Sequence, residues 1–218
     1  MIQEHQLKNY TWLEVVKPNP EEAQQLVNDH QLPPKFKNYM LDRHEQPHAT
    51  FDLVGRFDVL VVRAMAFSKH QVSNTTPIFI GFSPHLLITV THTSGAMHLF
   101  SRMPLDPNDY LYHQIFRVLQ RVLQPYFQEV DNITEIAEEM TNNSKIDQAR
   151  LNKISTLKAK MVYLRSATAG NLIALQELRD ILRQRLGKDF PSRRQILSEL
   201  NDLIVEFRQC QTTFDVAS

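Results

Sequence analysis

The sequence ISTLKAKMVYLRSATAGNLIALQELRDILRQRL at residues 154–186 decides the fold, because its apolar residues recur every three or four positions. They are Ile154, Leu157, Met161, Leu164, Leu172, Leu175, Leu178, Leu182 and Leu186, with Thr168 in the same register. This spacing places them on one face of an α-helix and is typical of a helix packed along another helix. The pattern therefore predicts one long helix with a continuous buried face.

A second stripe of the same kind precedes it. Its members are Ile115, Leu119, Val122, Tyr126, Val130, Ile133, Ala137 and Met140. The polar residues 142–144 separate the two stripes, so we expect an antiparallel hairpin joined by a coiled-coil seam. Each helix would hold about 35 to 40 residues and extend roughly 50 to 60 Å at 1.5 Å per residue.

A third helical stripe follows the turn signals at residues 187–192, which include Gly187 and Pro191. Its apolar residues are Ile196, Leu200, Leu203, Phe207, Cys210 and Phe214. The pattern reaches Ser218 without a stop signal, so we expect it to be the start of a longer helix.

The first hundred residues predict a mixed α/β domain. Strand-like runs occupy 10–16, 49–54, 58–67, 76–82 and 86–92. Helices are expected from Pro20, with Asn19 as its N-cap, and over residues 33–43. Two of the strands are almost continuously apolar, which favours a sheet covered on both faces. We predict an αβα layered sandwich over 1–105, a long antiparallel helical hairpin over 106–187 and the start of a further helix over 188–218.

Composition excludes several classes of function. Lys and Arg number 24, as do Asp and Glu, so no basic excess favours nucleic acid. No apolar run reaches the roughly 18 residues that a membrane span needs. Cys210 is the single cysteine, which fits a reducing cytosol and excludes an internal disulfide. The five glycines form no phosphate-binding loop and no catalytic motif is found, so we expect no enzyme.

Charge separates the two arms of the predicted hairpin. The acids are Glu129, Asp131, Glu135, Glu138 and Glu139. The bases of the returning arm are Lys145, Arg150, Lys153, Lys158, Lys160 and Arg165. Opposite charges can flank an apolar seam and fix its pairing. Alternatively, the acidic tip gathers hydrated cations, because carboxylate oxygens suit hard divalent ions.

The order of several short motifs resembles the CorA family of magnesium transporters. WLEV at 12–15 with PEE at 20–22 is similar to the opening strand and helix of that family, and HEQP at 44–47 to the end of the helix before its central strands. FDVL at 57–60 and LLITVTH at 86–92 resemble its core strands. YFQEVD at 126–131 and residues 157–165 resemble its acidic and basic arms, and residues 193–207 its stalk helix.

The resemblance implies the cytoplasmic domain of a transporter or channel that carries Mg²⁺ or another divalent cation. That domain senses intracellular Mg²⁺ and gates the pore of a pentamer, which is integral to the cell membrane. It also implies regulatory Mg²⁺ ligands at Glu199 and Asp202. The acidic pair that the family places across the subunit interface is replaced here by Asn38 and Tyr39, and Asp42, one turn away, is the candidate substitute.

Without its membrane helices, the isolated domain is expected to be a monomer or a weak homo-oligomer. The alternative function is a stand-alone cytosolic module that offers its coiled-coil hairpin to partner proteins. That alternative predicts an exposed partner groove along the hairpin.

Overall fold

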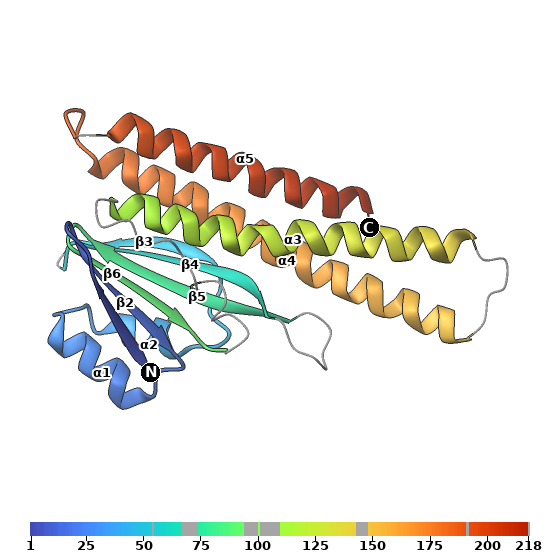
Figure 1. Cartoon of the computed structure of the whole chain (residues 1–218), viewed down its shortest axis with the longest axis horizontal. Coiled ribbons are helices and arrows are strands. Elements are labelled where there is room, and N and C mark those ends of the chain that lie inside the picture. The colour runs from blue at the N-terminus through green and yellow to red at the C-terminus, as the bar shows by residue number, and fades with distance from the viewer. Residues whose placement is uncertain are drawn as a thin grey trace.

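A six-stranded sheet with helices on both faces forms the first part of the chain (Figure 1). The computed structural model describes residues 1–53, 55–66, 74–93, 100, 110–142, 148–190 and 192–217. Its elements are β1 (Ile2–Gln6), β2 (Thr11–Val16), α1 (Pro20–Asp29), α2 (Lys35–Leu41), β3 (His48–Asp52), β4 (Phe57–Ala66), β5 (Asn74–Ser83), β6 (Leu86–Thr91), α3 (Leu111–Asn142), α4 (Gln148–Arg185) and α5 (Arg193–Ala217).

The sheet has the strand order β1-β2-β6-β5-β4-β3. Only β2 and β6 run parallel, and the other neighbours are antiparallel. A parallel pair needs a long crossover, and the segment between β2 and β6 contains α1, α2 and three strands. The predicted αβα sandwich is therefore confirmed, although its sheet is mixed.

The side chains of the central strands alternate between the two faces of the sheet, and this explains the three layers of helix, sheet and helix. In β4, Val59 and Val61 belong to the core under α1 and α2, whereas Leu60 and Val62 belong to the core under the long helices. Successive side chains of a strand point to opposite faces of the sheet. A nearly continuous apolar strand can therefore fill both cores, as the sequence predicts.

Local signals also explain the first helix and the first strand. The Asn19 side chain accepts hydrogen bonds from the backbone N–H groups of Glu21 (2.9 Å) and Glu22 (2.7 Å), which confirms it as the N-cap of α1. Strand β1 was not predicted, because its side chains are mostly exposed and show no apolar period. Pairing with β2 creates this edge strand.

The three long helices confirm the helical predictions. Buried residues include Leu119, Tyr126 and Ile133 of α3, Leu164 and Leu175 of α4, and the whole predicted stripe of α5. The side chains at the outer end of the hairpin, such as Ile154 and Met140, are only half-buried. The predicted boundary at 105 and 106 lies outside the described residues.

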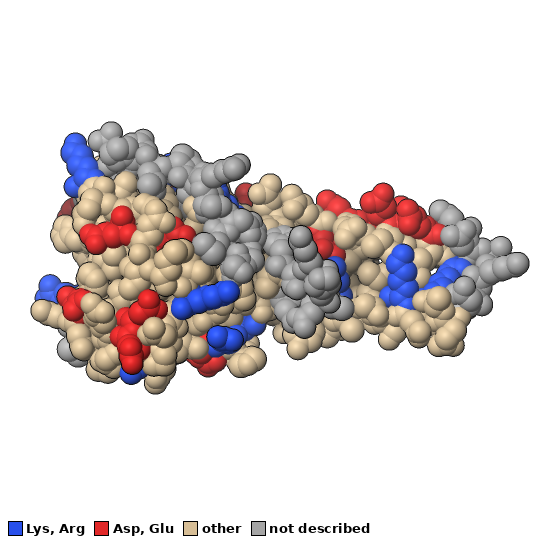
Figure 2. Space-filling view, turned by 60° about the horizontal axis from the view of Figure 1, so that its bottom comes forward, with Lys and Arg blue, Asp and Glu red and all other residues tan. Residues whose placement is uncertain are grey.

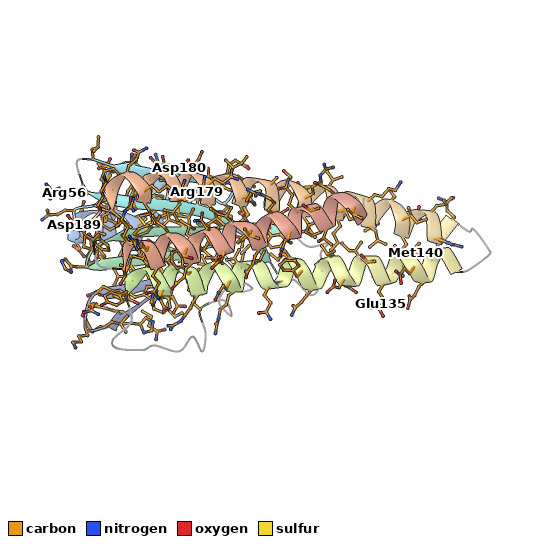
Figure 3. All side chains as sticks on the ribbon, turned by 90° about the horizontal axis from the view of Figure 1, so that it is seen from above. Arg56, Glu135, Met140, Arg179, Asp180 and Asp189 are labelled. Atoms are coloured by element: carbon orange, nitrogen blue, oxygen red, sulfur yellow. The ribbon has the colours of Figure 1, made fainter. Side chains whose placement is uncertain are left out.

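The seam differs from the prediction in one respect. Helix α5 lies above and between α3 and α4 and packs against both (Figure 3). The apolar stripes of α3 and α4 therefore face the sheet and α5 as well as each other. The two arms pair with each other much less than each pairs with α5, because α5 packs against both. Sequence periodicity identifies a buried face, but it does not identify the element that covers that face.

Candidate functional site

Two candidate acids lie one helical turn apart on α5. The Gln195 side-chain amide donates to Glu199 Oε1 at 2.8 Å, and His113 Nε2 of α3 lies 3.5 Å from the same oxygen. Asp202 is exposed, and it makes no hydrogen bond or ion pair that is seen among the described residues. Ile196, Leu200 and Leu203 form the buried stripe of α5; Glu199 lies at the edge of that stripe next to α3, whereas Asp202 is directed to solvent.

Asp42, the third predicted ligand, directly follows α2. Its Oδ1 accepts a hydrogen bond from the backbone N–H of His44 at 2.7 Å, and the residue is exposed. Helices α2 and α5 cover opposite faces of the sheet, so the structure does not bring Asp42 together with Glu199 or Asp202 within one chain. The described residues contain no cluster of three or more His, Cys, Asp or Glu that could hold a metal ion. A site that uses all three acids would need two chains.

His92 lies in the same region as the end of α2. It is buried just after β6, and this burial lowers the pKa of its imidazole. The nearby Arg43 lowers the pKa further, whereas Asp42 raises it. The neutral imidazole is therefore favoured, although the negative charge of Asp42 favours the protonated one.

A buried polar cluster attaches α4 to the sheet. The Asn171 side chain accepts from the backbone N–H of Arg63 at 2.7 Å and donates to its carbonyl at 2.8 Å, and the Tyr126 hydroxyl also donates to that carbonyl at 2.8 Å. Strand β3 begins at His48, opposite Val61, and so stops short of Arg63. The amide of Asn171 therefore takes the place of a neighbouring strand, because buried backbone groups need partners.

The Arg63 guanidinium extends this cluster toward α2. It donates to the carbonyl of Glu45 at 2.9 Å and to Thr75 Oγ1 at 2.8 Å. Burial lowers the pKa of Arg63, whereas Tyr126, Tyr163 and Asp42 raise it through their charges.

One pair of opposite charges joins the two arms of the hairpin. Lys160 donates a short hydrogen bond to Glu129, which links α4 to α3. Asp131, Glu135 and Glu139 are exposed. Acids gather along one edge of the hairpin and bases lie on the neighbouring side (Figure 2). Lys145 lies outside the described residues.

An open groove of about 450 Å³ lies between α3 and α4 near the tip of the hairpin. Its lining is mainly apolar, and Glu138, Arg150 and Lys158 also contribute. The apolar lining residues are Ile133, Ala137, Met140, Ile154, Leu157 and Met161. Met140 lies on the side of α3 that faces α4, whereas Glu135 points away from it (Figure 3). The groove continues the trough that α5 fills closer to the sheet.

Sequence reasoning missed His113, Gln195 and Asn171. His113 and Glu199 are 86 positions apart, and no local pattern connects them. Asn171 lies next to Leu172 and does not break the apolar repeat of the helix, so the repeat gave no reason to single it out. The signal that could have identified it is a polar side chain next to that repeat.

The fold defines the class of domain, namely a mixed six-stranded sheet covered on both faces and joined to a long helical hairpin. The chain is similar to the complete structure of the CorA magnesium transporter from Methanocaldococcus jannaschii, with a TM-score of 0.77 and 18% identity over 95% of this chain and 65% of that one. It is also similar to the soluble domain of the same CorA (TM-score 0.73, 19% identity, 95% and 82% covered). The ZntB cytoplasmic domain from Vibrio parahaemolyticus RIMD 2210633 gives a TM-score of 0.69 at 14% identity, with 99% and 87% covered.

The sequence itself identifies the family. The model described as CorA-like Mg2+ transporter protein matches residues 8–217, so the chain belongs to this family. A comparison with curated protein sequences gives no match. The chain spans 65% of the length of the M. jannaschii transporter. Among the described residues, no helix combines the length and the apolar character that crossing a bilayer requires.

Proposed function

We propose that this chain is the regulatory domain at the cytoplasmic face of a membrane-embedded divalent-cation transporter, and that it senses intracellular Mg²⁺ and gates the pore. The observation that carries this proposal is the family match, which includes the sheet, the hairpin and the third helix. In this proposal Mg²⁺ is both the regulatory and the transported ion. The chain acts as a binding domain within a homo-oligomer, a pentamer in the complete protein, and catalyses no reaction.

The regulatory step follows from electrostatics between chains. Glu199 and Asp202 of one chain would face Asp42 of a neighbour, and these carboxylates repel one another when no cation is present. Carboxylate oxygens are the ligands that Mg²⁺ takes, and the ion keeps several of its waters. The exposed carboxylates of Asp202 and Asp42 fit such a hydrated ion. Binding Mg²⁺ would favour the closed assembly, and losing it would let the chains separate.

Isothermal titration calorimetry tests the site directly. Mg²⁺ should bind the native chain weakly, roughly in the millimolar range that is usual for exposed carboxylates. Combining Glu199→Gln, Asp202→Asn and Asp42→Asn should remove this heat, and Asp189→Asn, at an exposed acid outside the proposed site, should not. Unchanged binding in the triple variant would contradict the proposed regulatory site.

Light scattering tests the proposed assembly. Without Mg²⁺ the chain should be a monomer or weak oligomer, and its average mass should rise as Mg²⁺ is added. A tight pentamer in the absence of Mg²⁺ would show that the ion is not what holds the chains together.

The groove between α3 and α4 favours a second candidate function, a stand-alone protein-interaction module. Reading the native gene beyond the codon for Ser218 separates the two candidates. The transporter predicts an apolar membrane span in that frame, and the interaction module predicts a stop codon close to Ser218.

A further inference from the structure

Three polar side chains meet where α3 and α5 begin. His113 is in the first turn of α3, and Gln195 and Glu199 are one turn apart on α5. The two helices lie side by side here (Figure 1). His113 Nε2 lies 3.5 Å from Glu199 Oε1 and 3.4 Å from Gln195 Nε2, and Gln195 Nε2 lies 2.8 Å from Glu199 Oε1. Three polar atoms from two helices therefore form one compact triangle.

The size of this triangle fits a coordinated metal ion. A tetrahedral Zn²⁺ ion has bonds of about 2.0 to 2.1 Å to nitrogen and oxygen, so its ligand atoms lie roughly 3.3 to 3.4 Å apart. Two sides of the triangle are close to this length, and the third is a hydrogen bond of 2.8 Å that a bound ion would replace. An ion roughly 2.1 Å from all three atoms would lie just outside their plane.

The triangle is open to solvent on one side and fixed by packing on the other. The side chains of His113 and Glu199 are 25% and 35% exposed, and Gln195 is exposed. An ion can therefore reach the three atoms, and a water molecule would complete its tetrahedron, as in zinc sites with three protein ligands. Ile196 and Leu200 next to the two α5 ligands are buried, and this packing fixes the position of both ligands on a rigid helix.

The kinds of ligand atom select the ion. Imidazole nitrogen suits Zn²⁺ and other late transition metals, whereas Mg²⁺ takes oxygen ligands. The Gln195 amide presents its oxygen to the site after half a rotation, because its oxygen and its NH₂ group occupy matching positions. An imidazole, a carboxylate and an amide oxygen form a mixed set that favours Zn²⁺ over Mg²⁺.

The neighbouring bases are directed elsewhere. Arg117, one turn along α3 from His113, donates to Gln114 Oε1 at 3.4 Å. Arg193 of α5 donates to the carbonyl of Leu186 at 2.9 Å, toward the turn after α4. Among the described residues, the carboxylate of Glu199 contacts an amide and an imidazole rather than an arginine. Its negative charge is thus left for a cation.

We propose that His113, Gln195 and Glu199 bind a borderline divalent cation, and that Zn²⁺ fits the site best. All three ligands belong to one chain, so this site needs no assembly, unlike the proposed Mg²⁺ site between chains. The site stands on its own geometry, and one consequence rests on the proposed function. Because both sites use Glu199, Zn²⁺ bound here would weaken the binding of regulatory Mg²⁺.

Isothermal titration calorimetry with Zn²⁺ tests the site on the native chain. His113→Ala and Glu199→Gln should each lower the affinity at least about tenfold, because even the loss of a group behind a metal ligand costs about 10- to 100-fold. His85→Ala, at an exposed histidine of the β5–β6 turn, is the matched control and should leave the affinity unchanged. Circular dichroism checks that each variant keeps its helices. Unchanged affinity in His113→Ala, or an equal loss in His85→Ala, would overturn the proposal.

Co²⁺ supplies a second measurement that reports the geometry of the site. Tetrahedral Co²⁺ absorbs visible light far more strongly than the octahedral hydrated ion does, so coordination can be followed directly. The native chain should give the strong bands, and His113→Ala and Gln195→Ala should both weaken them. If the bands of the native chain are those of the hydrated ion, the three-ligand site is wrong.

Titration with Mg²⁺ separates this site from the proposed function. His113→Ala should leave Mg²⁺ binding unchanged, since Mg²⁺ takes oxygen ligands. If Zn²⁺ does not bind while Mg²⁺ binding through Glu199, Asp202 and Asp42 persists, the Zn²⁺ site is wrong and the regulatory site stands. If Zn²⁺ binds through His113 and Mg²⁺ binding is absent, the Zn²⁺ site stands and the regulatory site is wrong.

Discussion

The two arms of the hairpin have similar inner sides and different outer sides. On α3 the outer side is polar throughout, with Gln124, Gln128, Asp131 and Glu135 exposed. On α4 the outer side exposes the large apolar residues Leu151, Val162 and Ile173 next to the charged Lys158 and Arg165. The outer side of α3 is therefore that of an ordinary surface helix, whereas the outer side of α4 mixes charged residues with exposed apolar ones.

The largest expected effects concern the inner sides, where the two arms should behave alike. Leu119→Ala on α3 and Leu175→Ala on α4 each remove a fully buried side chain. Each should lower the free energy of unfolding by about 2 to 5 kcal/mol, through lost burial and the cavity left behind. Urea unfolding followed by circular dichroism measures both. A loss confined to one arm would show that the inner sides are not equivalent.

The attachment of α4 to the sheet should give the next largest effect. Asn171→Ala leaves the backbone N–H of Arg63 without its partner and removes one of the two hydrogen bonds to its carbonyl. The expected cost is about 1 to 3 kcal/mol of unfolding free energy, the penalty for a buried polar group left unpaired. Asn152→Ala, at an exposed asparagine of the same helix, is the control for loss of the amide itself. Equal stability of the two variants would mean that the polar cluster contributes nothing.

The outer sides of both arms should matter little for stability. Val162→Glu on α4 and Gln124→Glu on α3 should each change the unfolding free energy by no more than about 0.5 kcal/mol, as exposed substitutions usually do. Urea unfolding measures both variants, and a loss above about 1 kcal/mol in either would show that its side chain is packed in solution.

A small pH effect should come from the sheet and not from either arm. Burial lowers the pKa of His92 in the folded chain below its ordinary value of 6.5, so unfolding takes up a proton as the pH falls. Stability from this group is fully present above the ordinary pKa and is lost as the pH falls through the lowered one. Unfolding measured from pH 7.5 down to pH 5 should therefore show a decline that His92→Gln reduces. An unchanged decline in that variant would assign it to other groups.

Much of the fold could be predicted because its signals are local. Three kinds of signal depend on residues close in sequence: the apolar stripes of the three long helices, the N-cap at Asn19 and the continuous apolar run of β4, which the structure describes as far as Ala66. Strand β1 could not be predicted, since its exposed residues become a strand only by pairing with β2. The position of α5 between the two arms was likewise beyond the sequence pattern.

The candidate site shows the same division. Acidic residues on α5 and at the hairpin tip can be found by reading the chain, and Glu129 does pair with Lys160 as the opposite charges of the arms suggest. The contact of His113 with Glu199, 3.5 Å apart, joins residues from two different helices. The separation of Asp42 from Glu199 by the whole sheet also became visible only in three dimensions.

The sequence by itself determined which residues share a face of each helix and strand, because that depends on a local repeat of 3.6 or 2 residues. Only the tertiary structure decided what lies against each face, because packing joins residues that are far apart along the chain. The inner face of α4 meets the sheet and α5, and its outward face meets nothing in the described part of the chain.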